Sequence, residues 1–192
     1  EMLADETANK LTLSDQHITV TGTITVEQAN LLEATTSGVI TASITTTERV
    51  DELKTLSGTG NAYTIVIADD DATSTTAAQL NAINALTSDT VNLTNVTALA
   101  ASTLTDLGTL ATAINNNEFS NAAGLTTIAV TDTTIDATTL ATRIDSYDSI
   151  NGGSTTGMTL ASGTTINVDA GEITEMLADE TQGRLTIDHQ LI

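Results

Sequence analysis

The order of apolar and polar residues along this chain repeats a pattern six times. Each repeat begins with a Thr or Asp suited to a helix N-cap, and an acidic or amide residue usually follows three positions later. Apolar residues occupy the fourth and seventh positions after the cap, which share one helical face. The pattern predicts six short amphipathic helices, with caps at Thr25, Thr46, Thr76, Thr103, Thr133 and Asp169.

A stop signal and a β-rich stretch accompany these helices. Gly or Asp falls twelve to fourteen residues after four of the caps, at Gly38, Gly58, Asp89 and Gly183. Gly is favoured there because it tolerates a left-handed backbone, and Asp tolerates it next best. Stretches rich in Thr, Val and Ile follow, as is typical of strands. The predicted strands are 39–45, 63–68, 90–96, 125–130 and 184–187.

The heptapeptide EMLADET occurs at positions 1–7 and again at positions 175–181. The intervals between predicted caps average about 29 residues, a length that suits one unit of a repeat protein. Six such intervals match the offset between the two heptapeptides, so the copies are interpreted as the same part of a helix in two repeats of one array. We expect Met2, Leu3, Met176 and Leu177 to face the core.

A repeat of this length cannot bury its apolar face alone, so successive repeats must stack. We predict an α/β solenoid of six to seven coils, with one short helix and one parallel β-strand per coil of about 29 residues. Residues 1–192 are interpreted as a single array segment, excerpted from a longer repeat protein. The surplus residues at 14–23, 115–124 and 151–157 are expected to form loops or short extra strands.

Composition restricts both the core and the chemistry. The chain contains 42 Thr, no Pro, Cys or Trp, and three aromatic residues, Tyr63, Phe119 and Tyr147. Leu, Ile, Val and Ala must therefore fill most of the core. The absence of Cys excludes disulfides, thiolate chemistry and Cys-ligated zinc.

The charge is strongly acidic, with 25 Asp and Glu against five Lys and Arg and a net charge of −20. Such a surface excludes nucleic acid as a partner, because phosphate binding needs clustered Lys and Arg. No apolar run approaches the roughly 18 residues of a membrane span, so this segment is not expected to insert into a membrane. An acidic surface stays soluble in high salt, which favours an extracellular, cell-surface setting.

Two histidines are the first candidates for chemistry. His17 and His189 follow the two heptapeptide copies at a similar distance. Their near-recurrence suggests that both derive from the repeat, so we expect exposed structural histidines rather than ligands or catalysts.

Two groups of acidic residues are candidates for cation binding. Asp69, Asp70 and Asp71 form the densest acidic run. Carboxylate oxygens suit calcium, but solvation just before a helix start is the favoured interpretation. Asp136, Asp145 and Asp148 are likewise interpreted as a solvated helix face, and at most diffuse calcium binding is expected.

The run Asn115-Asn116-Asn117 with Glu118 and Phe119 lies in the longest predicted insertion. Insertions of repeat proteins often carry binding sites. An ordinary polar loop is the favoured interpretation, with Phe119 packing that loop onto the core.

Thr pairs at Thr19/Thr21 and Thr23/Thr25 are similar to those of ice-binding solenoids, which need a flat Thr row in constant register. The predicted strands instead read Thr41-Ala42-Ser43, Thr64-Ile65-Val66 and Asn92-Leu93-Thr94. Because residue types drift between strands, an ice- or mineral-binding face is a lesser alternative.

Catalysis needs convergent titratable or nucleophilic groups, and the sequence contains no Gly-x-Ser-x-Gly and no paired carboxylates at a suitable spacing. We therefore assign no catalytic, cofactor-binding or metal-binding residue and expect a protein that is not an enzyme.

Thr-, Ala- and Asp-rich units such as residues 24–45 and 74–94 resemble tandem repeats of giant surface proteins from marine cyanobacteria and other aquatic bacteria. This resemblance implies an exported structural segment that serves adhesion, motility or a surface layer. Neighbouring repeats of the same chain are the expected partners, together with cell-surface glycans or other surface proteins. The alternative is an adhesin module that binds a ligand, calcium, ice or a mineral.

Overall fold

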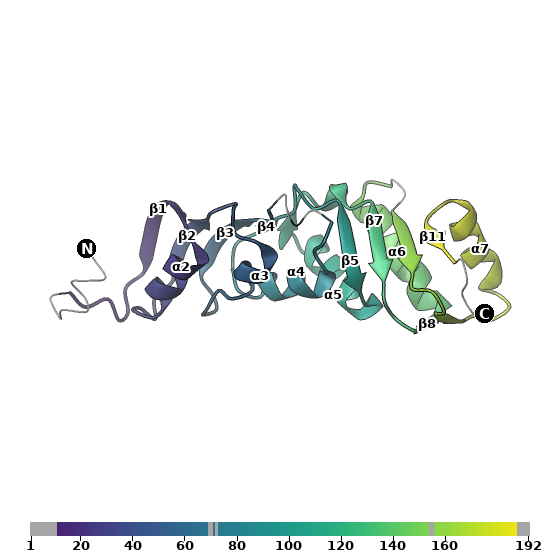
Figure 1. Cartoon of the computed structure of the whole chain (residues 1–192), viewed down its shortest axis with the longest axis horizontal. Coiled ribbons are helices and arrows are strands. Elements are labelled where there is room, and N and C mark those ends of the chain that lie inside the picture. The colour runs from purple at the N-terminus through teal and green to yellow at the C-terminus, as the bar shows by residue number, and fades with distance from the viewer. Residues whose placement is uncertain (1–10, 69–70, 72, 154–155, 188–192) are drawn as a thin grey trace.

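The computed structural model describes residues 11–68, 71, 73–153 and 156–187. These residues form an elongated body in which helices and strands follow one another along the long axis in chain order (Figure 1). β1 (Ile18–Ile24) lies near one end, and α7 (Ile173–Thr181) lies near the other. The second copy of EMLADET forms most of α7, whereas the first copy, at positions 1–7, lies outside the described residues.

The fold is α/β, as predicted. The described helices are α2 (Val26–Glu33), α3 (Val50–Leu53), α4 (Ala77–Asn84), α5 (Leu104–Asn115), α6 (Ala137–Ile150), α7 and the 3-10 helix η2 (Ala122–Gly124). After β1 the described strands are β2 (Ile40–Ile44), β3 (Ala62–Val66), β4 (Val91–Asn92), β5 (Ala98–Ser102), β6 (Phe119–Ser120), β7 (Thr127–Val130), β8 (Thr134–Asp136), β9 (Gly157–Leu160), β10 (Thr165–Asn167) and β11 (Leu185–Thr186).

All strand pairs in the described residues are parallel. One sheet has the order β1-β2-β3-β4-β6, a second has the order β11-β9-β7-β5, and β8 pairs with β10. The second sheet begins before the first one ends. Ala100 of β5 forms a bridge with Thr76, the N-cap of α4, while β4 of the first sheet still pairs with β3. The two sheets therefore overlap along the chain.

The spacing between paired strands is not constant along the chain. Ile18 pairs with Ile40, and Thr41 pairs with Ala62, so the first two separations are clearly shorter than the predicted coil. Further along, Thr127 pairs with Gly157, a separation close to the predicted coil length. The mean interval derived from the sequence therefore conceals a short spacing at the start and a longer one afterwards.

The expectation of one strand per helix is also wrong beyond α4. Two strands lie between α4 and α5, three between α5 and α6, and two between α6 and α7. Helix length alone does not account for the extra strands. α2 and α4 both have eight residues, yet one strand lies between α2 and α3 and two lie between α4 and α5.

Three of the predicted helix caps are confirmed. Thr25, Thr76 and Thr103 are N-caps whose side chains accept from the backbone amide three residues later. The first two also form the reciprocal bond, since their amides donate to the Gln28 and Gln79 side chains. At these positions the local signature alone determined the helix start.

The other three caps were placed three residues too early. The helices begin after Arg49, Asp136 and Glu172, where the sequence predicted Thr46, Thr133 and Asp169. Asp169 nevertheless forms the predicted reciprocal bonds with Glu172: its carboxylate accepts from the Glu172 amide at 3.2 Å, and its amide donates to the Glu172 carboxylate at 3.0 Å. Asp136 accepts from the Thr139 amide at 2.9 Å, so the acid interpreted as the third residue is itself the cap. An acid three residues after a Thr is therefore ambiguous, because Asp is also a strong N-cap.

The three helices α5, α6 and α7 are each followed by a residue in the left-handed conformation. Gly183 follows α7 with φ 73°, as predicted, and Asn117 and Gly152 occupy the same place after α5 and α6 with φ 64° and 68°. In each case the amide of the next residue donates to a carbonyl five residues back, the bond of a Schellman motif. The run of Asn residues at 115–117 is therefore a helix end rather than a loop insertion.

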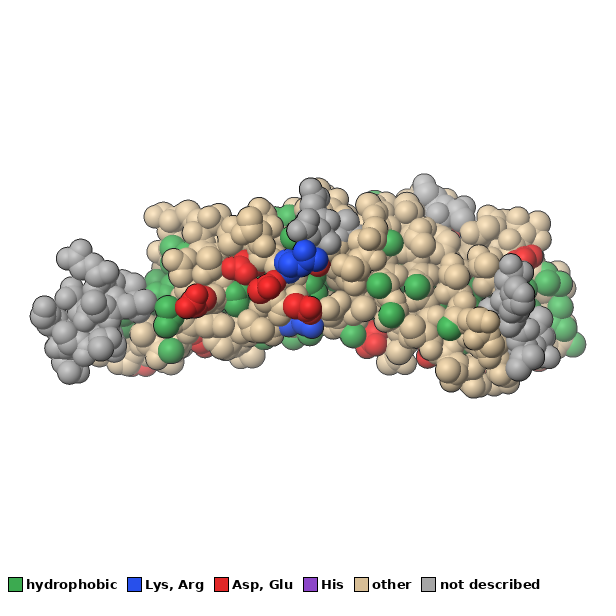
Figure 2. Space-filling model, viewed as in Figure 1, with side chains coloured by type: hydrophobic (Ala, Val, Ile, Leu, Met, Phe, Trp, Pro, Cys, Tyr) green, Lys and Arg blue, Asp and Glu red, His purple; other side chains and the backbone are tan. Residues whose placement is uncertain are grey.

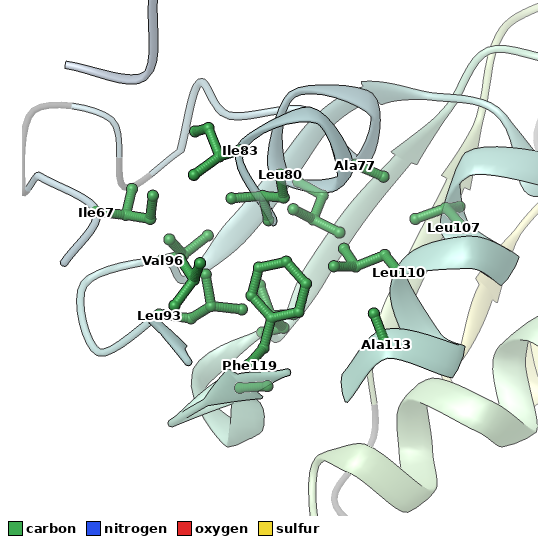
Figure 3. Packing of buried hydrophobic residues seen from close by; sticks show 14 of the residues in the cluster. Ile67, Ala77, Leu80, Ile83, Leu93, Val96, Leu107, Leu110, Ala113 and Phe119 are labelled. Carbon is green, nitrogen blue, oxygen red and sulfur yellow. The ribbon is translucent and has the colours of Figure 1, made fainter. Parts of the chain in front are cut away.

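The core is a continuous layer of Leu, Ile, Val and Ala between the strands and helices. All three aromatic residues are buried in it, including Phe119, which lies among the labelled side chains from α4 and α5 in Figure 3. Met176 is buried as predicted, but Leu177 is 46% exposed, so the prediction for Leu177 is wrong. Met2 and Leu3 lie outside the described residues.

Charged side chains are unevenly distributed on the face shown in Figure 2. Acidic and basic groups gather over α2 and α3, whereas the face toward α7 is mainly uncharged polar surface with scattered apolar groups. Of the described helices, none is long and apolar enough to cross a lipid bilayer.

Candidate functional site

A concave surface lies between α6 and α7. It has a volume of about 170 Å³, an apolar floor that includes Leu140 and Met176, and an acidic rim that includes Asp145, Glu175 and Asp179. Because it combines apolar lining with titratable groups, this groove is the first candidate for a binding site.

Arg184 neutralises the acidic groups at one end of the groove. Its guanidinium contacts Asp145 at 3.2 Å and Asp148 at 3.1 Å, and it also forms an ion pair with Asp179. Burial raises the pKa of the Asp179 carboxyl above its usual range, while the Arg184 charge opposes this shift. Asp179 is only 2% exposed, whereas the Asp145 side chain is 66% exposed, so Arg184, just before β11, joins α6 and α7 in a partly buried ion network.

Asp148 has a further structural role that the sequence did not reveal. Its second carboxylate oxygen accepts from the Thr156 amide at 2.8 Å, which fixes the chain entering β9. Asp136 lies at the other end of α6, where it caps the helix. Asp136 and Asp145 are exposed, as predicted, but Asp148 is only partly exposed, and Asp136 lies at the opposite end of α6, so the three residues do not form one solvated face.

A second groove lies between α2 and α3. Its acidic residues are Glu27, Glu48 and Glu52. Glu48 accepts from the Val26 amide at 3.1 Å, and Glu52 accepts from the Arg49 amide at 2.9 Å. Two of these three carboxylates are thus engaged by helix starts.

A third groove crosses α4, α5 and α6 and is lined mainly by Asn and Thr side chains. Arg143 reaches into it from α6, where its Nε donates to the Leu104 carbonyl at 3.0 Å and its guanidinium lies against Gly108. Asn81 donates to the Asp106 carbonyl at 3.0 Å, but its Oδ1 is buried with no partner in the part of the chain that the structure describes.

Asp71 is the described member of the acidic run, and Asp69 and Asp70 lie outside the described residues. Asp71 is buried, accepts from the Val50 amide at 2.8 Å and forms an ion pair with Arg49 at 3.1 Å. The prediction of a solvated carboxylate is therefore wrong for Asp71, which is a structural group between two helices.

His17 is exposed, as predicted, and its Nδ1 accepts from the Val39 amide at 3.0 Å. This bond connects the chain before β1 to the chain before β2. His189 lies outside the described residues. Among the residues that the structure does describe, no group of three or more His, Asp or Glu is arranged to hold a metal ion.

Thr side chains form only short rows across the first sheet. Thr19 pairs with Thr41, but the next position is Ala62. Thr23, Ser43 and Thr64 form a second row, which an irregularity around Gly22 separates from the first. Thr25 caps α2 instead of extending the strand. The drift of residue types that the sequence indicated is present in the paired strands.

The most regular polar feature was not predicted at all. The first amide of each helix from α2 to α5 donates to a side chain that lies 21 to 28 residues later, just before the next helix. We call these side chains the start acceptors: Glu48, Asp71, Ser102 and Asp132. Helix-start amides have no partner within their own helix, so each unit completes the helix of the unit before it.

Comparisons with known proteins identify no relative. No protein-family model matches the chain, and no curated protein or solved structure matches it at a significant level.

Proposed function

We propose that this chain is a non-catalytic structural segment of a large exported bacterial surface protein, in which solenoid coils extend a scaffold for adhesion, motility or a surface layer. The observation that carries this proposal is the series of start acceptors. Each start acceptor accepts a hydrogen bond from the preceding helix. It therefore stabilises the contact between successive parts of the array and does not bind a ligand.

The environment of the titratable groups also supports this function. Asp71, Asp148, Asp179 and Arg184 all bond to neighbouring segments. An enzyme of the hydrolase type would instead need titratable groups converging on a shared cleft. The net charge of −20 would keep such an extended surface apart from its neighbours in saline water.

The test is to extend the array. A chain in which residues 1–174 precede residues 1–192 would place EMLADET at the joint in its natural sequence context. We expect small-angle X-ray scattering to show a maximum dimension close to twice that of the single chain, with an unchanged cross-section. Two separate bodies on a flexible joint, or a thicker particle, would contradict the proposal.

A ligand-binding adhesin module is the second candidate, and the groove over α4, α5 and α6 favours it. The groove contains Arg143, Glu118 and Asn81, whose Oδ1 has no partner among the described residues, together with Asn and Thr side chains. Cell-surface glycans would be its expected ligands. Binding on a glycan array that is lost in Arg143→Met but kept in Lys54→Met would favour this candidate over a purely structural segment.

A further inference from the structure

The face formed by α6 and β9 is covered by residues 175–186 of the same chain. Leu185 pairs with Met158, and Thr186 pairs with Thr159. Met158 donates its amide to the Arg184 carbonyl at 2.8 Å, and the Arg184 side chain binds two carboxylates of α6. A segment that binds this face therefore needs apolar side chains, a strand that pairs with β9 and a cation opposite the carboxylates of α6.

The chain carries a second copy of the segment that fits this face. Residues 1–12 read EMLADETANKLT, and residues 175–186 read EMLADETQGRLT, so nine of twelve positions are identical. The identical residues include those that make the buried contacts: Met2 corresponds to Met176, Asp5 to Asp179 and Leu11 to Leu185.

The three differences keep the charge and the backbone requirement of the contacts. Lys10 corresponds to Arg184 and supplies a cation, although one ammonium replaces the forked guanidinium that contacts three carboxylates. Asn9 corresponds to Gly183, which has φ 73° and no atom near the position of an added Cβ, and Asn tolerates that backbone well. Ala8 corresponds to the exposed Gln182.

Equivalent leucines have different environments at the two ends of the molecule. Leu185 is 2% exposed, whereas Leu11 is 39% exposed. β1, which follows Leu11 in the chain, lies at the end of the body opposite to α7 (Figure 1). Because the first twelve residues lead into β1, the α6 and β9 face of a second copy is the one that we assign to them.

We propose that residues 1–12 of one copy bind the α6 and β9 face of a second copy, in place of that copy's residues 175–186. The exchange joins copies head to tail, which is a heterologous contact that can repeat without closing. This proposal rests on the match between two segments and one face, and it holds whether or not the chain serves a bacterial surface.

Disulfide trapping tests the exchange, because the full chain has no native Cys. Thr12→Cys in one copy and Thr159→Cys in a differently tagged copy would occupy paired positions, where Cα atoms lie within disulfide range. Thr159 is exposed in β9, so the substitution does not disturb the core. The matched control replaces Thr159→Cys by Thr64→Cys, which is exposed on β3.

We expect the Thr12→Cys and Thr159→Cys mixture to form about tenfold more mixed dimer than the control mixture, since tenfold needs only ~1.4 kcal/mol of preference. Met2→Asp in the donor copy should abolish this excess by placing a charge at a buried position. Met176→Asp in the acceptor copy should raise it, because that change loosens the competing segment. Equal yields with the control, or a yield unaffected by Met2→Asp, would overturn the proposal.

Discussion

The helices before and after the middle of the chain differ in length and in how they end. α2, α3 and α4 have eight, four and eight residues, and each ends on a right-handed residue. α5, α6 and α7 have twelve, fourteen and nine residues, and each ends in a Schellman motif with Asn or Gly in a left-handed conformation. The strand spacing rises along with this change. Longer helices and wider strand spacing therefore occur in the same half of the chain, while start acceptors link the helices from α2 to α5 to the segments that follow them.

The two halves are expected to differ most in how much an ion pair contributes to the free energy of unfolding. Arg184→Met would leave Asp179 buried without its cation, so we expect a loss of roughly 3 kcal/mol in the free energy of unfolding. Lys54→Met removes an exposed pair with Asp51 in the early half and should leave the urea midpoint unchanged. Equal midpoints for the two variants would show that the Arg184 network does not stabilise the late half.

Two glycines separate two ways in which an added Cβ can destabilise the fold, namely a clash with neighbouring atoms and strain in the backbone. Gly38 precedes β2, and an added Cβ would clash with the Gln16 carbonyl, so Gly38→Ala should cost about 2 kcal/mol. Gly152 follows α6 with φ 68° and open space around it, so Gly152→Ala should cost about 1 kcal/mol from backbone strain alone. Thermal or urea unfolding measures both, and the reverse order would contradict this assignment.

The two tyrosines give a matched pair of hydroxyl deletions. Tyr147 donates its hydroxyl to the Leu107 carbonyl at 3.1 Å, whereas the Tyr63 hydroxyl is buried with no partner among the described residues. Tyr147→Phe should cost about 1 kcal/mol, and Tyr63→Phe should be neutral or stabilising in the same urea titration. A larger loss for Tyr63→Phe would mean that its hydroxyl has a partner in solution.

The same phenols make the fold sensitive to alkaline pH. Burial raises the pKa of Tyr63 from 10.0 to about 12, with a smaller contribution from the Glu33 charge, and burial also raises the pKa of Tyr147. Because both values are raised, the stabilisation is complete below pH 10 and is lost as pH rises through about 12. Absorbance at the phenolate band should therefore change little at pH 10. Half-ionisation there in folded protein would contradict the burial of these rings.

Local signals explain what the sequence could predict. The caps at Thr25, Thr76 and Thr103 were found because a capping signature involves only a few consecutive residues. β5 was missed because its sequence, ALAAS, has little strand propensity, and its partner β7 lies beyond the whole of α5 in the chain. Tertiary pairing overrides local preference in such a segment.

The start acceptors could not be predicted for a related reason. Asp71 and Asp132 act on amides 21 and 28 residues earlier, and that distance depends on helix lengths that the sequence pattern averaged. The Arg184 network did leave a signal. Lys10 and Arg184 stand at the same distance after the two heptapeptides, and a recurring cation in an acidic chain indicates a carboxylate partner.

Amide hydrogen exchange at the start of α5 tests most directly whether each unit completes the preceding helix. The Leu104 amide donates to Asp132 at 2.8 Å, while Thr105, the next residue of the helix, lies on the exposed side. We predict that the Leu104 amide exchanges much more slowly than the Thr105 amide, and that Asp132→Ala makes the two rates alike. Equally fast exchange of both amides in the unmodified protein would contradict the account.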